Sequence, residues 1–555
     1  MNMLKVNKNL FLVISILLFS CAQNTNQSSD STQNQIPYLK KQGYTTQLIV
    51  DNSPFIILGG ELGNSSFTSI EYMQAVWPKL KKMNLNTVLA PVYWELIEPS
   101  EGKFDFKLID SLTKEANNQN LKIVFLWFAS WKNSMSSHVP SWVKLDEERF
   151  PRIKDKDGFS HEILTPFSEN NLQADLNAFK ALTTHIKKIN EKNQTVILVQ
   201  VENEIGMLPT ARDYHPLANK KFLENVPTEL IDYLNNNAEK LVPEFRQVWS
   251  KNGFKTSGTW EEIFGTGTHT DEIFMAWYFS KYANAIIEEG KKIYPLPMFV
   301  NAALNRPDTE PGKGYPSAGP LPHLMDIWKA GGKSIDFLAP DIYFGEIEDW
   351  CDLYTRQENT LFIPEHRFNS TAAAKAAFVI GHYEGIGFSP FSIESTDAPD
   401  NNSISKMYGL INQLIPVISA QHGQNKIDGV LLDKNKPQTT LQFGDYEFNV
   451  KHSYTLGWEE KAKNEVWEPA AAIIVQTNKN EFYIAGNGIV ITFTNISDPN
   501  LIAGILKNEE GRFENNEWKI IRHLNGDQTH QGRHIRIFYE DYSIQKLELY
   551  NYKKK

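Results

Sequence analysis

The stretch Val196–Gly206 reads VILVQVENEIG, and it decides the fold. An almost continuous apolar run ends in Glu202-Asn203-Glu204 and is closed by Gly206. Such a run is typical of a strand that is buried on both faces of a parallel sheet. In α/β barrels the active site lies at the carboxyl ends of the strands. The stretch therefore predicts a buried strand that delivers Glu204 to an active site as a general acid/base.

Other short apolar runs have the same character. They are Phe55–Gly59, Thr87–Tyr93, Lys122–Phe128, Met298–Asn301, Ile335–Tyr343, Leu361–Pro364 and Ile386–Ile393. Amphipathic stretches lie between them, for example 70–83, 106–118, 173–188, 271–294 and 372–381. Repeated strand–helix alternation predicts an α/β fold, a (β/α)₈ TIM barrel. A doubly wound open sheet is the alternative, but no glycine-rich turn follows the first strand.

The domain organisation follows from a change in pattern along the chain. We expect the barrel to occupy residues 38–424. From about Gly429 short alternating segments separated by Asn, Gly and Asp predict a C-terminal antiparallel β-sandwich, residues 425–555. Two long connections, Ser130–Asn170 and Met207–Thr270, are expected either to shape the substrate cleft or merely to pad the barrel or pack against the second domain.

The N-terminal residues indicate export. Lys5 and Lys8 precede the apolar run Leu10–Phe19, which is too short to span a membrane. Ser20-Cys21 follows, and the segment resembles a bacterial lipobox. We expect a signal peptide (1–20), a lipidated Cys21 and a flexible tether (21–37), which together predict an exported lipoprotein in the periplasm or on the outer membrane. A plain secretory signal is the alternative.

Composition and cysteine usage exclude several classes of protein. The net charge of −10 and the pI of about 5.8 argue against binding to nucleic acid. Beyond Cys21 the only cysteine is Cys351, and no CxxC pattern is present. We therefore expect no cofactor, no metal site and a buried structural role for Cys351. The only membrane contact that we expect is the lipid anchor, and the sequence does not predict an oligomeric state.

A second glutamate completes a chemical pair. Glu365 ends the seventh expected strand, in the segment FIPEHR. Strands four and seven lie on opposite sides of a barrel, so Glu204 and Glu365 are expected to face each other across its axis. Hydrolysis of a glycosidic bond needs one carboxylic acid and one carboxylate placed in this way. Glu202 either points into the site with Glu204 or lies buried and hydrogen-bonded beneath it.

Several segments carry a family resemblance. The segments QVENEIG, FIILGGE and PVYWELIEPSEGKFDF resemble glycoside hydrolase family 35, the β-galactosidases. The segment GRFENNEWKIIRHLNGDQTHQGRHIRI resembles the β-domain of a bacterial subgroup of that family. The resemblance covers most of the chain after Tyr44. It implies a retaining exo-β-galactosidase that acts on plant or algal oligosaccharides.

The resemblance also implies residue roles. Glu204 would be the acid/base and Glu365 the nucleophile. Asn203 would bind the sugar 2-hydroxyl, and Tyr343 would hydrogen-bond to Glu365. Retention predicts carboxyl groups about 5–5.5 Å apart, whereas inversion predicts about 6.5–9.5 Å.

Four further residues are candidate sugar contacts. The resemblance implies contacts from Tyr93 and Glu95 in strand two. Glu61 ends strand one and is expected to bind a sugar hydroxyl, and Trp131 is expected to offer an apolar platform.

The chain departs from the family after strand three. It has Phe128-Ala129-Ser130-Trp131 where typical members carry an Asn-Ala-Glu-like segment whose glutamate binds galactose hydroxyls. A β-glucosidase or an α-L-arabinopyranosidase therefore remains an alternative, as does a non-catalytic carbohydrate-binding lipoprotein.

Overall fold

A computed structural model describes residues 35–555. The predicted signal peptide, the lipidated Cys21 and most of the predicted tether lie outside the described residues. The described chain begins with a small antiparallel sheet of β1 (Tyr38–Gln42), β2 (Thr45–Val50) and β3 (Ser53–Phe55). Among residues 35–555 no helix is both long enough and apolar enough to span a membrane.

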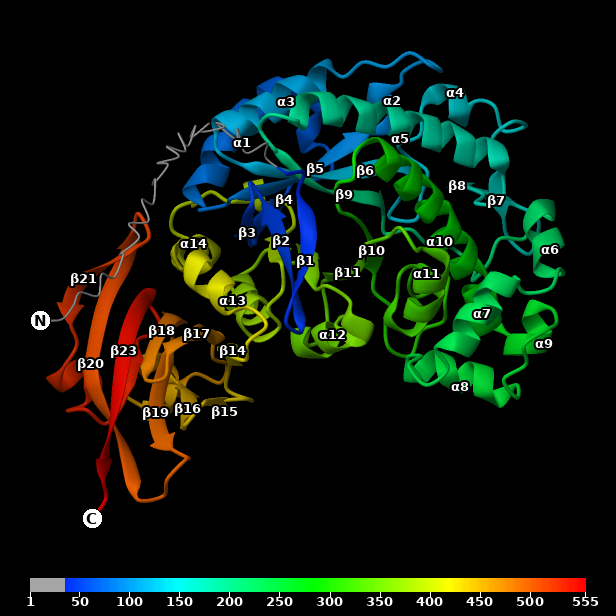
Figure 1. Cartoon of the computed structure of the whole chain (residues 1–555). Coiled ribbons are helices and arrows are strands. Elements are labelled where there is room, and N and C mark those ends of the chain that lie inside the picture. Colours follow the sequence, from blue (N-terminus) through cyan, green and yellow to red (C-terminus); the bar gives the residue numbers. More distant parts are fainter. Residues whose placement is uncertain (1–34) are drawn as a thin grey trace, which may run out of the picture. The chain divides into compact units, whose positions relative to one another are not determined.

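The centre of the fold is a closed barrel of parallel strands, as predicted (Figure 1). In chain order the strands are β4 (Ile57–Glu61), β5 (Thr87–Tyr93), β6 (Lys122–Lys132), β9 (Val196–Asn203), β10 (Met298–Ala303), β11 (Phe337–Ile342), β12 (Phe362–His366) and β13 (Gly387–Pro390). Each strand pairs with the next in this order, and β13 pairs with β4 to close the ring. Nearly every residue of these strands is buried, which explains their continuous apolar sequences.

Helices follow the strands and cover the outside of the barrel. They are α1 (Ile70–Lys82), α3 (Lys107–Asn118), α5 (Glu169–Asn190), α10 (Thr268–Ile293), α11 (Met325–Gly331), α12 (Ile347–Tyr354), α13 (Ala372–His382) and α14 (Ser403–Gln421). The helix α5 begins at a Ser168 cap, whose hydroxyl accepts the N–H of Asn171. Cys351 is buried on α12.

The two long connections fold into short elements. The first contains α4 (Ser141–Lys144), β7 (Arg152–Lys154) and β8 (Ser160–Leu164), and the second contains α6 (Pro216–Phe222), α7 (Thr228–Asn236), α8 (Pro243–Lys251) and α9 (Trp260–Phe264). In the second connection α9, with its buried Trp260 and Phe264, contacts α10, α8 with its buried Trp249 contacts α9, and α7 contacts α11. This connection thus extends the core on one side of the barrel (Figure 1).

The C-terminal region contains two antiparallel sheets. The first is ordered β14 (Ile427–Leu432), β17 (Ala470–Asn478), β18 (Glu481–Asn487), β23 (Ser543–Lys553), β20 (Leu501–Glu514) and β21 (Glu517–His523). The second is ordered β15 (Gln438–Phe443), β16 (Tyr446–His452), β19 (Ile489–Asn495) and β22 (Ile535–Ile537). Side chains from both sheets form one core, which confirms the predicted fold class of a barrel followed by a β-sandwich.

Strand β17 shows how the sandwich meets the barrel. Its first residues are buried on both faces. Ile473 and Val475 pack into the barrel core beside α13 and α14, whereas Ala472 and Ile474 pack into the sandwich core. Alternate residues of a strand point to opposite faces, so one apolar run serves two cores.

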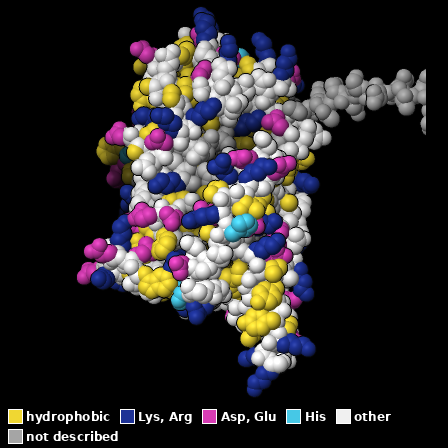
Figure 2. Space-filling model, turned by 90° about the vertical axis from the view of Figure 1, so that its left-hand side faces the viewer, with side chains coloured by type: hydrophobic (Ala, Val, Ile, Leu, Met, Phe, Trp, Pro, Cys, Tyr) yellow, Lys and Arg dark blue, Asp and Glu magenta, His cyan; other side chains and the backbone are white. Residues whose placement is uncertain are grey.

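Charged side chains of both signs are interspersed on the molecular face drawn in Figure 2, and small apolar areas lie between them. No wide area of a single sign is visible on that face.

Candidate active site

The carboxyl ends of the barrel strands surround a cavity of about 370 Å³. Its lining includes Glu204, Asp341, Glu365 and Tyr343, and the loop after β10 forms one wall. The complete lining is Asn64, Lys132, Asn133, Glu204, Ala303, Leu304, Arg306, Gly314, Tyr315, Pro316, Asp341, Tyr343, Phe344, Glu365 and Phe391. The first long connection contributes Lys132 and Asn133, but no residue of 207–270 lines this cavity.

Strand β9 loses its regular geometry where it enters the site. Glu202 and Glu204 adopt left-handed backbone conformations, with φ of 61° and 47°. Non-glycine residues pay about 1 kcal/mol or more for this conformation, which is common at functional sites. In a regular strand, side chains two residues apart point to the same face. The left-handed conformations interrupt this pattern, so the side chains of Glu202 and Glu204 lie in different surroundings.

Glu204 faces the cavity. Its N–H donates to Asn301 Oδ1 at 3.0 Å, and its carbonyl accepts from Ser134 Oγ at 3.0 Å. Burial, and then the charge of Glu365, raise the pKa of Glu204 to about 7. A carboxyl group with this pKa still carries a proton close to neutral pH, as a general acid must.

Glu202 lies beneath the site, in the second of the two positions that the sequence allowed. Its Oε2 accepts the N–H of Trp131 at 2.7 Å. Burial and the neighbouring Asp175 raise its pKa well above the usual range. Asp175 in turn accepts from Trp127 Nε1 at 2.9 Å and from Ser130.

Glu365 is held by two neutral donors. Asn203 Nδ2 donates to its Oε1 at 3.2 Å, and the Tyr343 hydroxyl donates to its Oε2 at 2.7 Å. These two hydrogen bonds fix the orientation of the Glu365 carboxyl group toward the cavity. Burial, and then the charge of Glu365, raise the pKa of Tyr343, so its hydroxyl keeps the proton that it donates.

A third carboxyl group, Asp341, stands between these two. One oxygen each of Glu204, Asp341 and Glu365 lie within 4.8 Å of one another. Asp341 Oδ2 accepts from Asn301 Nδ2 at 2.6 Å, while its Oδ1 has no donor among the described residues. Burial, Glu365 and Glu204 raise its pKa well above the usual range. These oxygens are close enough to ligate a cation, although carboxylate-pair hydrolysis requires none.

Asp341 was not among the site residues predicted from the sequence, although its spacing from Tyr343 could have indicated it. It lies on β11 two residues before Tyr343, and residues two apart on a strand share a face. Lys132 and Asn301 were also not predicted as site residues from the sequence.

Glu61 is brought to the same group of acids. It is fully buried, and both carboxylate oxygens lack a donor among the described residues. Burial and the charge of Glu365 raise its pKa well above the usual range, and Lys132 opposes this shift. Glu61 does not line the cavity surface.

Like Glu61, the other three of these predicted sugar contacts do not line the cavity. Tyr93 is buried, and its hydroxyl donates to the carbonyl of Asn64 at 2.7 Å. Glu95 lies on α2 (Trp94–Ile97), which begins directly after β5 and turns Glu95 toward His138, 3.0 Å away. Trp131 is fully buried, edge-on against Phe279 and Tyr282. Tyr93 supports the Asn64 loop, and Trp131 belongs to the core.

The fold is a closed (β/α)₈ barrel, and it carries the carboxyl groups of Glu204 and Glu365 at the ends of its fourth and seventh strands. Glycoside hydrolysis requires such a pair of carboxyl groups.

Two protein-family models match the chain. The glycoside hydrolase family 42 model, described as "Beta-galactosidase", matches residues 69–273, which include Glu204 but not Glu365. "Domain of unknown function (DUF5597)" matches residues 404–536, from α14 into β22.

Similar proteins have related descriptions. The "Beta-galactosidase" of Xanthomonas manihotis is 28% identical over 188 residues, which cover 32% of this chain and 28% of that protein. The human "Beta-galactosidase-1-like protein 3" is 28% identical over 201 residues, which cover 35% of this chain and 28% of that protein. The matched part thus spans 28% of the length of each relative. These matches support similarity to β-galactosidases, and the matching model is family 42 rather than the expected family 35.

Two solved structures match part of this chain. The β-galactosidase of Bacillus circulans sp. alkalophilus has 12% identity and a TM-score of 0.43, with 65% of this chain and 57% of that chain covered. The β-galactosidase of the psychrophilic Marinomonas ef1 has 12% identity and a TM-score of 0.42, with 66% and 60% covered.

Proposed function

We propose that this protein is a retaining glycoside hydrolase, and specifically an exo-β-galactosidase that acts on plant or algal oligosaccharides. One observation carries the proposal. Glu204 and Glu365 face one cavity, with one oxygen of each within 4.8 Å of the other. Burial and the charge of Glu365 raise the pKa of Glu204, whereas the oxygens of Glu365 accept hydrogen bonds from Asn203 and Tyr343. This difference in surroundings supports Glu204 as the acid and Glu365 as the nucleophile.

The first step is attack by Glu365 on the anomeric carbon. As the glycosidic bond breaks, Glu204 transfers its proton to the leaving oxygen, and the glycone becomes an ester of Glu365. In the second step Glu204, now ionised, takes a proton from water, which attacks the same carbon and releases Glu365. The close approach of the two carboxyl groups supports this route, because inversion needs space for a water between them.

The surrounding groups support both steps. Asn203 and Tyr343 hold Glu365 in place through its two oxygens. When Glu365 becomes an ester, the charge that raises the pKa of Glu204 disappears. The lower pKa keeps Glu204 ionised at this stage, so that it can take a proton from water as a general base.

A panel of nitrophenyl glycosides tests the function. We expect release from the β-D-galactoside, with the β-anomer of galactose as the first product in proton NMR. Turnover of only the β-D-glucoside or the α-L-arabinopyranoside would reject the galactosidase assignment, and an α-anomeric first product would reject retention. A 2-deoxy-2-fluoro-glycoside of the accepted sugar is expected to label Glu365, which peptide mass spectrometry locates.

We further propose that the protein is exported and anchored by a lipid on Cys21. The basic residues, short apolar run and Cys21 of the N-terminal sequence support this proposal. Labelling of bacterial cells with an alkyne fatty acid is expected to mark the wild-type protein but not the C21S variant. Equal labelling of both would contradict it.

A further inference from the structure

Lys132 places a buried ammonium group in the catalytic cavity. The residue is 6% exposed and lines the cavity beside Glu204 and Glu365. Its Nζ donates to Asn203 Oδ1 at 2.8 Å and to Asn133 Oδ1. Among residues 35–555 no carboxylate lies within ion-pair distance of this ammonium. The charge of Lys132 lowers the pKa values of Glu61, Glu204 and Asp341, but its hydrogen bonds go to neutral amide oxygens.

The local backbone holds this lysine in place. The pairing of β6 with β9 shifts register between Trp127 and Lys132, so that Lys132 comes to lie opposite Asn203. The Lys132 N–H donates to the Met135 carbonyl at 2.8 Å, and the Met135 N–H returns a hydrogen bond at 3.0 Å. The ammonium also lies 4.8 Å from the centre of the Phe128 ring. A donor fixed in this way is suited to recognition.

The Lys132 ammonium has one N–H donor left for a ligand. An ammonium group has three N–H donors and no acceptor. Two amide oxygens take two of these donors, and the described residues offer no acceptor for the third. The cavity is the space in which a substrate oxygen would supply it.

On the basis of the proposed hydrolase function, we propose that Lys132 is a specificity-determining residue. It donates a hydrogen bond to one oxygen of the glycone and so selects glycones that carry an acceptor at that position. A carboxylate in that place would require a hydroxyl that donates, whereas an ammonium requires only an acceptor. An oxygen that accepts without donating, such as a methyl ether, can therefore satisfy Lys132.

Modified substrates test the polarity of this contact. The probes are nitrophenyl glycosides of the accepted sugar with single deoxy, deoxyfluoro or O-methyl replacements at C2, C3, C4 and C6. A deoxy position has no acceptor, whereas fluorine and a methyl ether accept without donating. The variants are K132M, which removes the donors at similar length, K132R, which keeps the charge, and K114M as a matched control on the exposed face of α3.

At one ring position we expect the wild-type enzyme to retain kcat/KM for the O-methyl or deoxyfluoro substrate and to lose about 10- to 100-fold for the deoxy substrate. In K132M that difference should vanish, while K114M should behave as the wild type. Fluorine also slows glycosyl transfer electronically, so the deciding quantity is the ratio between wild type and variant for the same substrate.

Two results would overturn the inference. One is a wild-type enzyme that loses as much activity with acceptor-only replacements as with deoxy replacements at every position. The other is a K132M variant that is slowed equally for all substrates, which would mean that Lys132 acts only through its charge on the carboxyl groups and not by contact with the glycone. The wild-type comparison needs no variant, so misfolding of K132M leaves the test intact. Failure of the proposed function would appear earlier, as absent turnover of every unmodified glycoside.

Discussion

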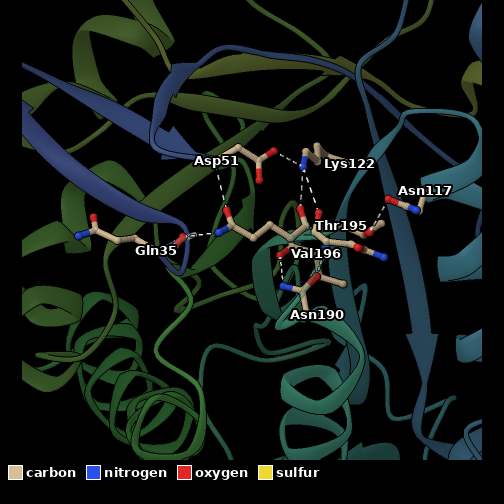
Figure 3. Close-up of polar contacts among 9 residues, drawn as sticks. Gln35, Asp51, Asn117, Lys122, Asn190, Thr195 and Val196 are labelled. Atoms are coloured by element: carbon tan, nitrogen blue, oxygen red, sulfur yellow. Dashed lines mark hydrogen bonds and ion pairs between the residues drawn. The ribbon is translucent and has the colours of Figure 1, made fainter. Parts of the chain in front are cut away.

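The polar groups at the two ends of strand β9 differ in how completely they are hydrogen-bonded within the protein. At the amino end Asn190 Nδ2 donates to the carbonyl of Val196 at 2.7 Å, and the Val196 N–H donates back to Asn190 Oδ1 at 2.8 Å (Figure 3). The side-chain oxygen of Gln194 accepts the Asp51 N–H at 2.9 Å, and Lys122 forms an ion pair with Asp51 at 2.6 Å. Donors and acceptors here satisfy one another within the protein.

At the carboxyl end of β9 several buried carboxylate oxygens have no hydrogen-bond donor among the described residues. Glu61 has two buried carboxylate oxygens without a donor among the described residues, and Asp341 has one. Glu202 and Glu204 adopt left-handed backbone conformations. Each of these features raises the free energy of the folded state. Strand β9 is therefore stabilised at its amino end by hydrogen bonds within the protein, whereas the polar groups at its carboxyl end are available to a ligand.

The largest effect is expected from E365Q, which removes the proposed nucleophile. Activity should fall about 10⁵-fold. The melting temperature should stay the same or rise, since one charge leaves a crowded group of acids. Steady-state kinetics and a thermal melt of the same preparation measure both quantities. Activity within tenfold of wild type would contradict the role of Glu365.

The second effect concerns Glu204 and depends on the leaving group. In E204A we expect kcat/KM to fall about 10³-fold for poor leaving groups and little for a dinitrophenyl glycoside, which leaves without a proton. Added azide should restore turnover, because it replaces the water that the missing base no longer activates.

The same variant has a pH signature. Glu204 must be protonated for the first step, so wild-type kcat/KM should decline as the pH rises through about 7. E204A should lack this decline with the dinitrophenyl substrate. A decline at the same pH in E204A would assign it to another group.

A third change tests the amino end of the strand. N190A leaves the backbone N–H and carbonyl of Val196 without their partners, which should cost about 2–4 kcal/mol of stability. The melting temperature should fall, while kcat of the folded protein should stay unchanged. N193A is the matched control at an exposed position nearby. A loss of kcat without a loss of stability would contradict the proposed division between the two ends.

Much of this arrangement could be predicted from the sequence. Buried parallel strands have continuous apolar sequences, so all eight barrel strands were found, and Thr87–Tyr93 coincides with β5. The side chains of Asn203, Tyr343 and Glu365, each expected at a strand end, do come together.

The remaining details depend on geometry that residue patterns do not encode. Regular alternation would give Glu202 and Glu204 the same direction, but left-handed conformations at both residues separate them. The shift in register between β6 and β9 brings Lys132 to Asn203, and strand periodicity does not reveal it. The family resemblance implied that Glu95 contacts the sugar, but a helix begins at Trp94 and turns Glu95 away from the cavity.

The smallest expected effect is a pH-dependent gain of stability in E61Q. Burial, and then Glu365, raise the pKa of Glu61 above its ordinary value of 4.5. The folded state thus binds this proton more tightly than the unfolded state does. The contribution of Glu61 to stability is therefore greatest below pH 4.5 and is lost as the pH rises. Since glutamine cannot ionise, E61Q should gain about 1–2 kcal/mol over wild type at pH 8 and less at pH 5. E148Q, at an exposed position, should show no such gain. An equal gain at both pH values would mean that Glu61 does not titrate on unfolding, and that the carboxyl end of the barrel is less strained than its unpaired oxygens indicate.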